Sequence, residues 1–350
     1  MRAAVMHPGG QVNVEEVAEA VLPGPDGVIV HIEATAICGS DLHLLHLMQV
    51  VPEGPVLHPG HEAIGTIVEA GPEVATLKVG DRVIVSAVVG CGRCGPCRSG
   101  DPAGCAAGTT AVHGAAPGQP GAQAEYLGVP AADYSCLRLP EGVDDDTAVL
   151  LTDILPTAYL GCQMAAITPG SSVAVVGAGP VGLLAVECAK LFSPAAIYCV
   201  DLLPERLARA ESRGAIPISN ANGDAVAQVI EATGGRGAPH VVEAIGADAT
   251  VAAAISMTAH SGTTSVVGVN LNPAAPLPMD QMFMKRLTLR SALVSVPELW
   301  AHLVPLVENG QRFGEGIFTH RLGLSEVGEA YAIFNERREG VEKVVLDPSR

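Results

Sequence analysis

The stretch SSVAVVGAGPVGLLAVECAKL, residues 171 to 191, constrains the fold of this 350-residue chain more than any other segment. A valine-rich apolar run leads into a glycine-rich turn and an apolar segment of helical length, which predicts a buried strand, a tight turn and a helix. The turn has the spacing G-x-G-x-x-G. Its glycines allow a tight turn, close approach of the backbone to a pyrophosphate, and close packing of the helix on the strand. We therefore expect a dinucleotide-binding turn at Gly177, Gly179, Pro180, Val181 and Gly182.

A second predicted strand, AIYCVD, ends at Asp201, nineteen residues after Gly182. An acidic residue at this distance accepts hydrogen bonds from the ribose hydroxyls of the adenosine. Its carboxylate would repel a ribose phosphate, and Leu202 and Leu203 supply no cation to neutralise one, so NAD is favoured over NADP. Because the nearby Arg206 could tolerate the phosphate, NADP stays open as the less favoured cofactor.

Further strand candidates, HVVEAIG and TTSVVGVN, follow at intervals filled by segments of helical length. This alternation predicts an α/β unit with a doubly wound parallel sheet. The chain has a formal net charge of -17 and no run of Lys or Arg, which argues against nucleic-acid binding. The first residues lack the pattern of a signal peptide, and the longest uncharged run is broken by glycine and proline, so we expect no membrane span and a cytoplasmic protein.

Nine cysteines in a reducing compartment argue for metal or catalytic uses rather than for disulfides. Four of them lie in CGRCGPCRSGDPAGC with the spacing C-x2-C-x2-C-x7-C. Four thiolates close a tetrahedral zinc site with no open position, which is typical of a structural metal. An iron–sulfur cluster also accepts four thiolates. The expected ligands are Cys91, Cys94, Cys97 and Cys105.

A second group of donors is spread over AICGSDLHLLH, GPVLHPGHEAIGTIVEAG and LLTDILPTAYLG. Cys38, His61, Glu62 and Asp153 offer a thiolate, an imidazole and two carboxylates, which suit a zinc site that keeps a position open for substrate. Each also has a plainer interpretation, since Cys38 could be a small core residue and Asp153 a helix cap. Spacing alone does not choose between these interpretations.

The segment GHEAIGTIVEAGPEV has the G-H-E-x2-G-x5-G signature and resembles the zinc-containing medium-chain alcohol dehydrogenases. The cysteine loop also lies where that family carries its structural zinc, and the likeness extends from Met1 to EGVEKVVLDP. The resemblance implies a GroES-like, mostly-β catalytic domain at 1–154, a Rossmann domain at 155–293 and a C-terminal return to the catalytic domain at 294–350. The segments TDILPTAYLG, GPVGLLAVECAK and VDLLPERL look most like the glutathione-independent formaldehyde dehydrogenase-like branch. The chain lacks the insertions of the formaldehyde-converting members, which favours a general alcohol as substrate.

The resemblance implies two zinc ions per chain and hydride transfer between an alcohol, or an aldehyde or ketone, and NAD. It assigns Cys38, His61 and Asp153 as ligands of the catalytic zinc, with Glu62 behind the metal as a transient ligand. Ser40 and His43 match positions that conduct the alcohol proton outward, and an imidazole titrating near neutrality suits that task. We interpret His46, His58 and His113 as structural.

Several further positions match residues that contact the cofactor in that family. The resemblance implies that Thr157 packs against the nicotinamide, that the loops at Gly246 and Val267–Val269 border it, and that Lys343 meets the pyrophosphate. The expected cofactor contacts in this group are Thr157, Arg206, Gly246, Val267, Gly268, Val269 and Lys343. The resemblance also implies a homotetramer or homodimer formed through the dinucleotide domains. Two alternatives stay open, a polyol or amino-alcohol dehydrogenase of the same superfamily and a non-catalytic sensor that binds NAD and zinc.

Overall fold

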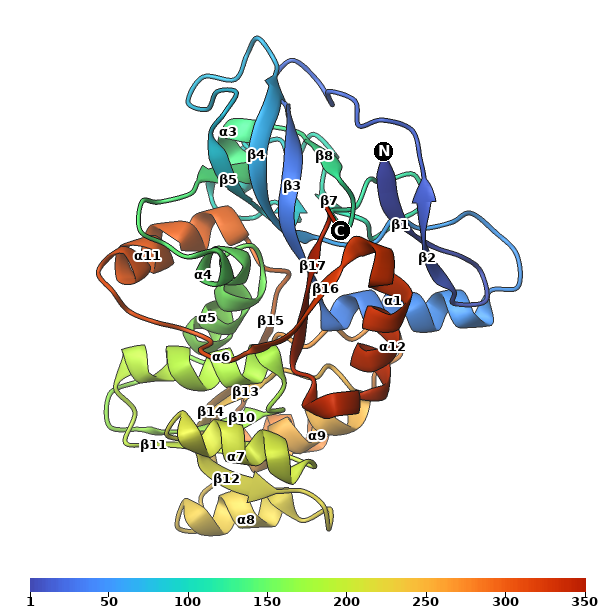
Figure 1. Ribbon diagram of the computed structural model, residues 1–350. Helices are drawn as coiled ribbons and strands as arrows, with labels where there is room; N and C mark the ends of the chain where they lie inside the picture. The colour runs from blue at the N-terminus through green and yellow to red at the C-terminus, as the bar shows by residue number, and fades with distance from the viewer. The chain divides into compact units, whose positions relative to one another are not determined.

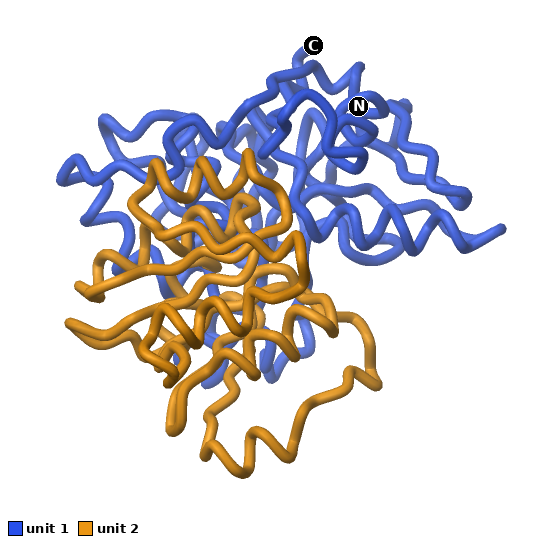
Figure 2. Tube along the Cα trace, turned by 90° about the horizontal axis from the view of Figure 1, so that it is seen from below, with its two compact units in different colours: residues 1–156, 295–350 blue, residues 157–294 orange.

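The protein is described by a computed structural model that covers residues 1–350 (Figure 1). It divides into two compact units, coloured separately in Figure 2. Unit 1 comprises Met1–Pro156 and Ser295–Arg350, and unit 2 comprises Thr157–Val294. These bounds lie within two residues of the domain limits expected from the sequence. The helix α5 (Ile154–Met164) begins in unit 1 and continues into unit 2.

Unit 1 is built on a seven-stranded sheet with the order β16-β17-β3-β4-β5-β9, in which β8 also pairs with β3. Its strands are β3 (Val28–Ile37), β4 (Glu62–Ala70), β5 (Arg82–Val85), β8 (Tyr126–Val129), β9 (Cys136–Arg138), β16 (Phe318–Gly323) and β17 (Lys343–Asp347). Short pairs are formed by β1 (Arg2–Met6) with β2 (Val12–Glu16) and by β6 (Val88–Val89) with β7 (Ala111–Val112). Because β17 pairs antiparallel with β3, the end of the chain is part of the sheet that its beginning forms.

The helices of unit 1 range from four to thirteen residues in length. They are α1 (Gly39–Val50), α2 (Gly95–Arg98), α3 (Ala132–Ser135), α4 (Asp145–Leu150), α11 (Val296–Glu308) and α12 (Val327–Glu336). One core cluster joins apolar side chains of α1, α12, β1 and β17, including Leu45, Met48, Tyr331 and Val344. A second joins β3, β4, β5 and β8 around Val30, Ile67, Val83 and Leu127. The first cluster therefore ties the C-terminal segment to α1.

Unit 2 has a six-stranded parallel sheet with the order β12-β11-β10-β13-β14-β15. The strands are β10 (Ser172–Val176), β11 (Ala196–Asp201), β12 (Ile216–Ser219), β13 (Ala238–Glu243), β14 (Thr258–Val266) and β15 (Thr288–Ser291). The intervening helices are α6 (Pro180–Ala189), α7 (Pro204–Ser212), α8 (Ala225–Ala232), α9 (Asp248–Met257) and α10 (Met279–Lys285). This is the strand order of a doubly wound dinucleotide-binding sheet, which confirms the predicted α/β fold class.

Candidate metal centres and nucleotide site

The four cysteines of the loop at 91–105 come together around one point. Their sulfur atoms all lie within 4.8 Å of one another, and Cys91 Sγ is 4.0 Å from Cys97 Sγ. Tetrahedral coordination with Zn–S bonds of about 2.3 Å places sulfurs about 3.8 Å apart, so the four donors fit such an ion. Backbone N–H groups of Cys91, Cys94 and Ala106 each approach a cysteine sulfur at 3.4 Å.

Hydrogen bonds prepare this loop for thiolate ligands. The Thr109 hydroxyl and the Cys91 backbone N–H lower the pKa of Cys105 to about 5. Burial, in contrast, raises the pKa of Cys97 to about 12. A bound cation offsets that cost because it favours the deprotonated sulfur. The loop therefore matches a closed metal site that holds structure and leaves no position for substrate.

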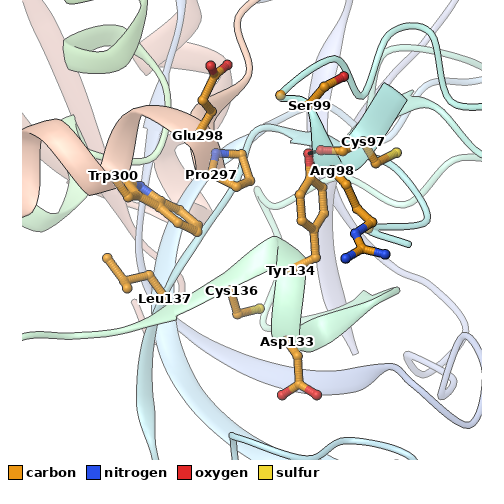
Figure 3. Close-up of a pocket in the computed structure, with 12 residues that line it drawn as sticks. Cys97, Arg98, Ser99, Asp133, Tyr134, Cys136, Leu137, Pro297, Glu298 and Trp300 are labelled. Atoms are coloured by element: carbon orange, nitrogen blue, oxygen red, sulfur yellow. Dashed lines mark hydrogen bonds between the residues drawn. The ribbon is translucent and has the colours of Figure 1, made fainter. Parts of the chain in front are cut away.

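A cavity of about 570 Å³ lies beside this loop, within unit 1 (Figure 3). Pro297 and Trp300 of α11 line it, as do Tyr134 and the segment Cys97–Gly100. The Tyr134 hydroxyl donates to the Cys97 carbonyl at 3.5 Å. Gly100 has φ +85°, and a Cβ there would meet the Glu298 carboxylate at 2.1 Å, so the loop and α11 approach closely. The cavity joins the cysteine loop to α11 and contains none of the second group of metal donors.

The second set of donors, Cys38, His61, Glu62 and Asp153, also converges in unit 1, with one ligand atom of each within 4.8 Å of all the others. Cys38 is the N-cap of α1, His61 directly precedes β4, and Asp153 lies in the turn between α4 and α5. Asp153 Oδ2 is 3.7 Å from Cys38 Sγ and 3.5 Å from His61 Nε2. Tetrahedral zinc places such donors about 3.4 to 3.6 Å apart, so these three atoms fit a zinc ion.

The charges of this cluster also suit a divalent cation. Four groups can be negative, namely the buried Cys38, Asp41 and Glu62 and the partly buried Asp153, and the permanent cation beside them is Lys343. Burial alone would lower the pKa of His61, but the charge of Asp41 and the hydrogen bonds that the ring donates to Asp153 and Asp41 raise it well above its ordinary value. The cluster therefore attracts positive charge. A bound metal ion supplies that charge in place of the extra proton on His61.

Glu62 is held behind the other donors by Lys343. Their side chains are 0% and 1% exposed, and Lys343 Nζ donates to Glu62 Oε1 at 2.7 Å and to the Ile37 carbonyl at 3.2 Å. Glu62 Oε2 has no hydrogen-bond partner. This placement differs from the expectation that Lys343 meets a pyrophosphate, because its fully buried ammonium is engaged by Glu62. Sequence position alone could not show which way this side chain turns.

Asp41 is a site residue that the sequence analysis did not single out. Its carboxylate is fully buried, accepts from the Cys38 backbone N–H at 2.9 Å through Oδ2, and places Oδ1 3.4 Å from His61 Nδ1. A carboxylate on the second nitrogen orients a metal-binding histidine and fixes its tautomer. The sequence held a partial signal, since Cys38 and Asp41 have the spacing of a helix capping box but not its usual residue types.

Two hydrogen bonds from other segments of unit 1 hold the backbone of the turn that carries Asp153. Trp300 Nε1 donates to the Leu151 carbonyl at 2.9 Å, and the Ala87 N–H donates to the Thr152 carbonyl at 3.0 Å. These two carbonyls immediately precede Asp153 in the chain. These hydrogen bonds therefore restrict the position of the carboxylate, and Trp300 is a second residue that sequence reasoning missed.

Ser40 and His43 lie on α1, three positions apart and hence on one face of the helix. Ser40 Oγ is 3.2 Å from His61 Nε2, which brings this hydroxyl to the cluster. His43 is half-buried, and burial, together with the charge of His46, lowers its pKa. The neutral imidazole that results can accept a proton. His46 instead pairs with Asn335, where Nε2 and Oδ1 are 2.8 Å apart.

In unit 2 the glycine turn follows β10 as predicted. Gly177 has φ +98°, and a Cβ on Gly182 would lie 1.8 Å from the Gly177 carbonyl oxygen, so neither position admits a side chain without rearrangement. Asp201, at the end of β11, accepts from the backbone N–H groups of Ala178 at 2.8 Å and Leu202 at 2.7 Å. Its carboxylate thereby links the glycine turn to the end of the neighbouring strand.

The loops after β13 and β14 also pass very close to each other. A Cβ on Gly268 would lie 2.1 Å from the Gly246 nitrogen, so Gly268 admits no side chain. The buried carboxylate of Glu243, which sequence reasoning missed, accepts from the Ile245 and Gly246 N–H groups and from the Thr250 hydroxyl. Val267 and Val269 follow β14, whereas Thr157 lies on α5, so these expected cofactor contacts come from several elements of unit 2.

Comparison with known proteins agrees with this architecture. Residues 24–141 match the model of the alcohol dehydrogenase GroES-like domain, and residues 180–309 match that of the zinc-binding dehydrogenase domain. A Mycobacterium tuberculosis protein named "Probable zinc-binding alcohol dehydrogenase" is 43% identical over 96% of this chain and 86% of its own length. The glutathione-independent formaldehyde dehydrogenase of Pseudomonas aeruginosa is 40% identical over 59% of this chain and 55% of its own.

Among solved structures, the alcohol dehydrogenase TADH from Thermus sp. ATN1 is similar over 99% of both chains, with 36% identity and a TM-score of 0.91. The match extends over both units, so a protein of known structure contains both a mostly-β unit and a parallel-sheet unit of this kind in one chain. None of the helices combines the length and the apolar character needed to cross a bilayer.

Proposed function

This chain belongs to the zinc-containing medium-chain alcohol dehydrogenase family and is a zinc-dependent oxidoreductase, and we propose that it transfers a hydride between a small alcohol and NAD. In the proposed site Cys38, His61 and Asp153 hold the catalytic zinc, and the four-cysteine loop holds a structural one. The observation that carries the proposal is the convergence of Cys38, His61 and Asp153 at separations that fit one tetrahedral ion.

Zinc bound at these donors supplies a Lewis acid that polarises the carbon–oxygen bond of the substrate. The residues of the chain then have distinct tasks. Ser40 offers a hydroxyl 3.2 Å from His61 Nε2, where it can take the proton of the alcohol. His43 follows on the same face of α1, and burial keeps it neutral near pH 7, so it is the proposed outer acceptor. Glu62 stays behind the donors because Lys343 holds it there.

The preference for NAD over NADP is proposed on the basis of Asp201. The carboxylate lies at the end of β11, two backbone N–H groups hold Oδ1, and a third holds Oδ2, so its position is fixed. A phosphate on the adenosine ribose would meet this negative charge. Gly177, Gly179 and Gly182 provide the close backbone approach that the pyrophosphate needs, and the loops at Gly246 and Val267–Val269 are the proposed neighbours of the nicotinamide.

We also propose that the protein is a homo-oligomer that pairs through unit 2. The strand β15 is an edge of the six-stranded sheet, so one row of its backbone groups has no neighbouring strand. Met279, Phe283 and Met284 of the adjacent α10 are 62%, 81% and 71% exposed. A second copy that covers this face would bury these apolar side chains and pair the edge. Light scattering that gives the mass of one chain would contradict this proposal.

The experiment that tests the function is a coupled measurement of metal content and nicotinamide absorbance. Purified protein is assayed against primary and secondary alcohols, polyols and aldehydes, with NAD and NADP in parallel. We expect two zinc ions per chain, turnover with NAD, and loss of both turnover and one zinc in Asp153→Ala. Two zinc ions and tight NAD binding without turnover on any alcohol or carbonyl compound would contradict the proposed reaction.

A further inference from the structure

A chain of buried polar groups runs from the C-terminal helix α12 to the nitrogen of His61 that faces away from the metal donors. The Tyr331 hydroxyl donates to Gln123 Oε1 at 3.0 Å, and Gln123 Nε2 donates to Asp41 Oδ2 at 3.3 Å. Asp41 Oδ1 then lies 3.4 Å from His61 Nδ1. Tyr331, Gln123 and Asp41 are 2%, 1% and 0% exposed, so solvent cannot replace any of these partners.

The two oxygens of Asp41 have different surroundings. Oδ2 accepts from two donors, the Cys38 backbone N–H and the Gln123 amide. Oδ1 has no hydrogen-bond partner within the usual distance, and it lies 3.4 Å from His61 Nδ1. The two donors on Oδ2 therefore fix the carboxylate plane and direct Oδ1 at the imidazole. With its proton on Nδ1, His61 presents the lone pair of Nε2 to the other metal donors, 3.5 Å from Asp153 Oδ2.

The side chain of Gln123 has little freedom apart from the orientation of its amide. Its backbone N–H donates to Pro59 O at 3.1 Å, and its carbonyl accepts from the Ala4 N–H at 2.7 Å. Its Cγ lies against Gly60, where an added Cβ would be only 2.6 Å away. The amide could still turn over, which would point its oxygen at the Asp41 carboxylate. The Asp41 carboxylate opposes that orientation because it would face the amide oxygen, and the Tyr331 hydroxyl anchors the other side of the amide by donating to Oε1.

We propose that Tyr331, acting through Gln123 and Asp41, is a positioning residue that orients His61 for metal binding at the catalytic site. The inference rests on the proposed function, because it takes Cys38, His61 and Asp153 as a metal site. In this proposal the C-terminal segment does more than pack against the sheet. Its helix α12 carries Tyr331, whose hydroxyl begins the chain of hydrogen bonds that leads to His61. No covalent step is involved.

The test compares Tyr331→Phe with Tyr198→Phe. Tyr198 is a matched control, because it is also buried and its hydroxyl donates to a carbonyl, that of Ala232 at 3.0 Å, but it lies in unit 2. Release of zinc from each protein to a chromogenic chelator gives one rate for each class of site. We expect Tyr331→Phe to raise the release rate of the more labile zinc about tenfold and to leave the release rate of the four-cysteine zinc unchanged. Tyr198→Phe should change neither rate.

A second variant distinguishes positioning from a general loss of packing. Gln123→Leu should raise the release rate of the same zinc. The double variant with Tyr331→Phe should release it no faster than Gln123→Leu alone, because both changes break one chain of hydrogen bonds. With Co²⁺ at the catalytic site, the visible spectra of Tyr331→Phe and Gln123→Leu should shift in the same direction. Wild-type zinc release and an unshifted cobalt spectrum in Tyr331→Phe would overturn the inference. A wild-type protein that holds only the four-cysteine zinc would instead refute the proposed function.

Discussion

The pairing of Lys343 with Glu62 gives a prediction whose size can be worked out. Both side chains are buried, and their charged atoms are 2.7 Å apart. Removing the ammonium by Lys343→Met leaves a buried carboxylate without a counter-ion. Burial already raises the pKa of Glu62, and Lys343 is the largest influence that opposes this rise. The variant should therefore fold with Glu62 protonated, because a lone buried carboxylate costs more than binding a proton.

The cost depends on pH in a definite direction. When folding raises the pKa of a group, the protein keeps its full stability below the unfolded pKa of that group. The free energy of unfolding then decreases as pH rises towards the folded pKa. With an unfolded glutamate pKa of about 4.3 and about 1.4 kcal/mol per pH unit, neutralising Glu62 costs about 4.5 kcal/mol at pH 7.5 and about 1.7 kcal/mol at pH 5.5. The estimate at pH 7.5 lies within the range of about 3 to 5 kcal/mol for breaking a buried ion pair.

Urea unfolding at these two pH values, with equal zinc loading, measures this loss in Lys343→Met. Lys78→Met is the matched control, because Lys78 is exposed and its removal should change stability by less than about 0.5 kcal/mol. The double variant Glu62→Gln with Lys343→Met should recover most of the loss, since it leaves no unpaired charge. A loss that is small and independent of pH, or a double variant no more stable than the single one, would refute the reasoning.

Three further predictions follow from other parts of the molecule. His43→Ala should lower turnover near neutral pH, and added imidazole should restore part of it. Since burial lowers the pKa of His43, turnover of the wild-type protein should fall with acid only below about pH 6.5. An unchanged dependence of turnover on pH in the variant would remove His43 from the relay. Cys105→Ala should leave one zinc per chain and lower the melting temperature, and retention of two zinc ions would contradict the assignment of that loop. Asp201→Asn should reduce the preference for NAD over NADP, which the ratio of the two kcat/KM values measures, and an unchanged ratio would show that another group selects the cofactor.

The sequence predicted the features that depend on local spacing. The glycines of the turn at 177–182 and the cysteines at 91–105 lie within short segments, where the conformation of a turn decides which atoms meet. The parallel sheet was predicted because strand and helix patterns alternate along residues 171–270. Its strand order was not predicted, since pairing between β10 and β13 joins segments more than sixty residues apart.

The convergence of Cys38, His61 and Asp153 joins three segments, and the resemblance to a family supplied it where spacing could not. The residues behind these donors were missed for the same physical reason. Tyr331 acts through Gln123, 208 positions away in the chain, and Lys343 meets Glu62 from 281 positions away. Only tertiary packing determines such partners. Asp41 is a partial exception, because it is only three residues from Cys38, the spacing of a helix capping box.

Transfer of a deuterium label from alcohol to cofactor tests whether this zinc site catalyses hydride transfer. The protein is supplied with NAD and the most reactive alcohol of the panel, deuterated at the carbinol carbon, and the reduced cofactor is analysed by mass spectrometry. We expect one deuterium per reduced nicotinamide in the wild-type protein and no reduced cofactor with Asp153→Ala at equal protein concentration. Unlabelled reduced cofactor, or full activity in Asp153→Ala, would contradict hydride transfer at this zinc site.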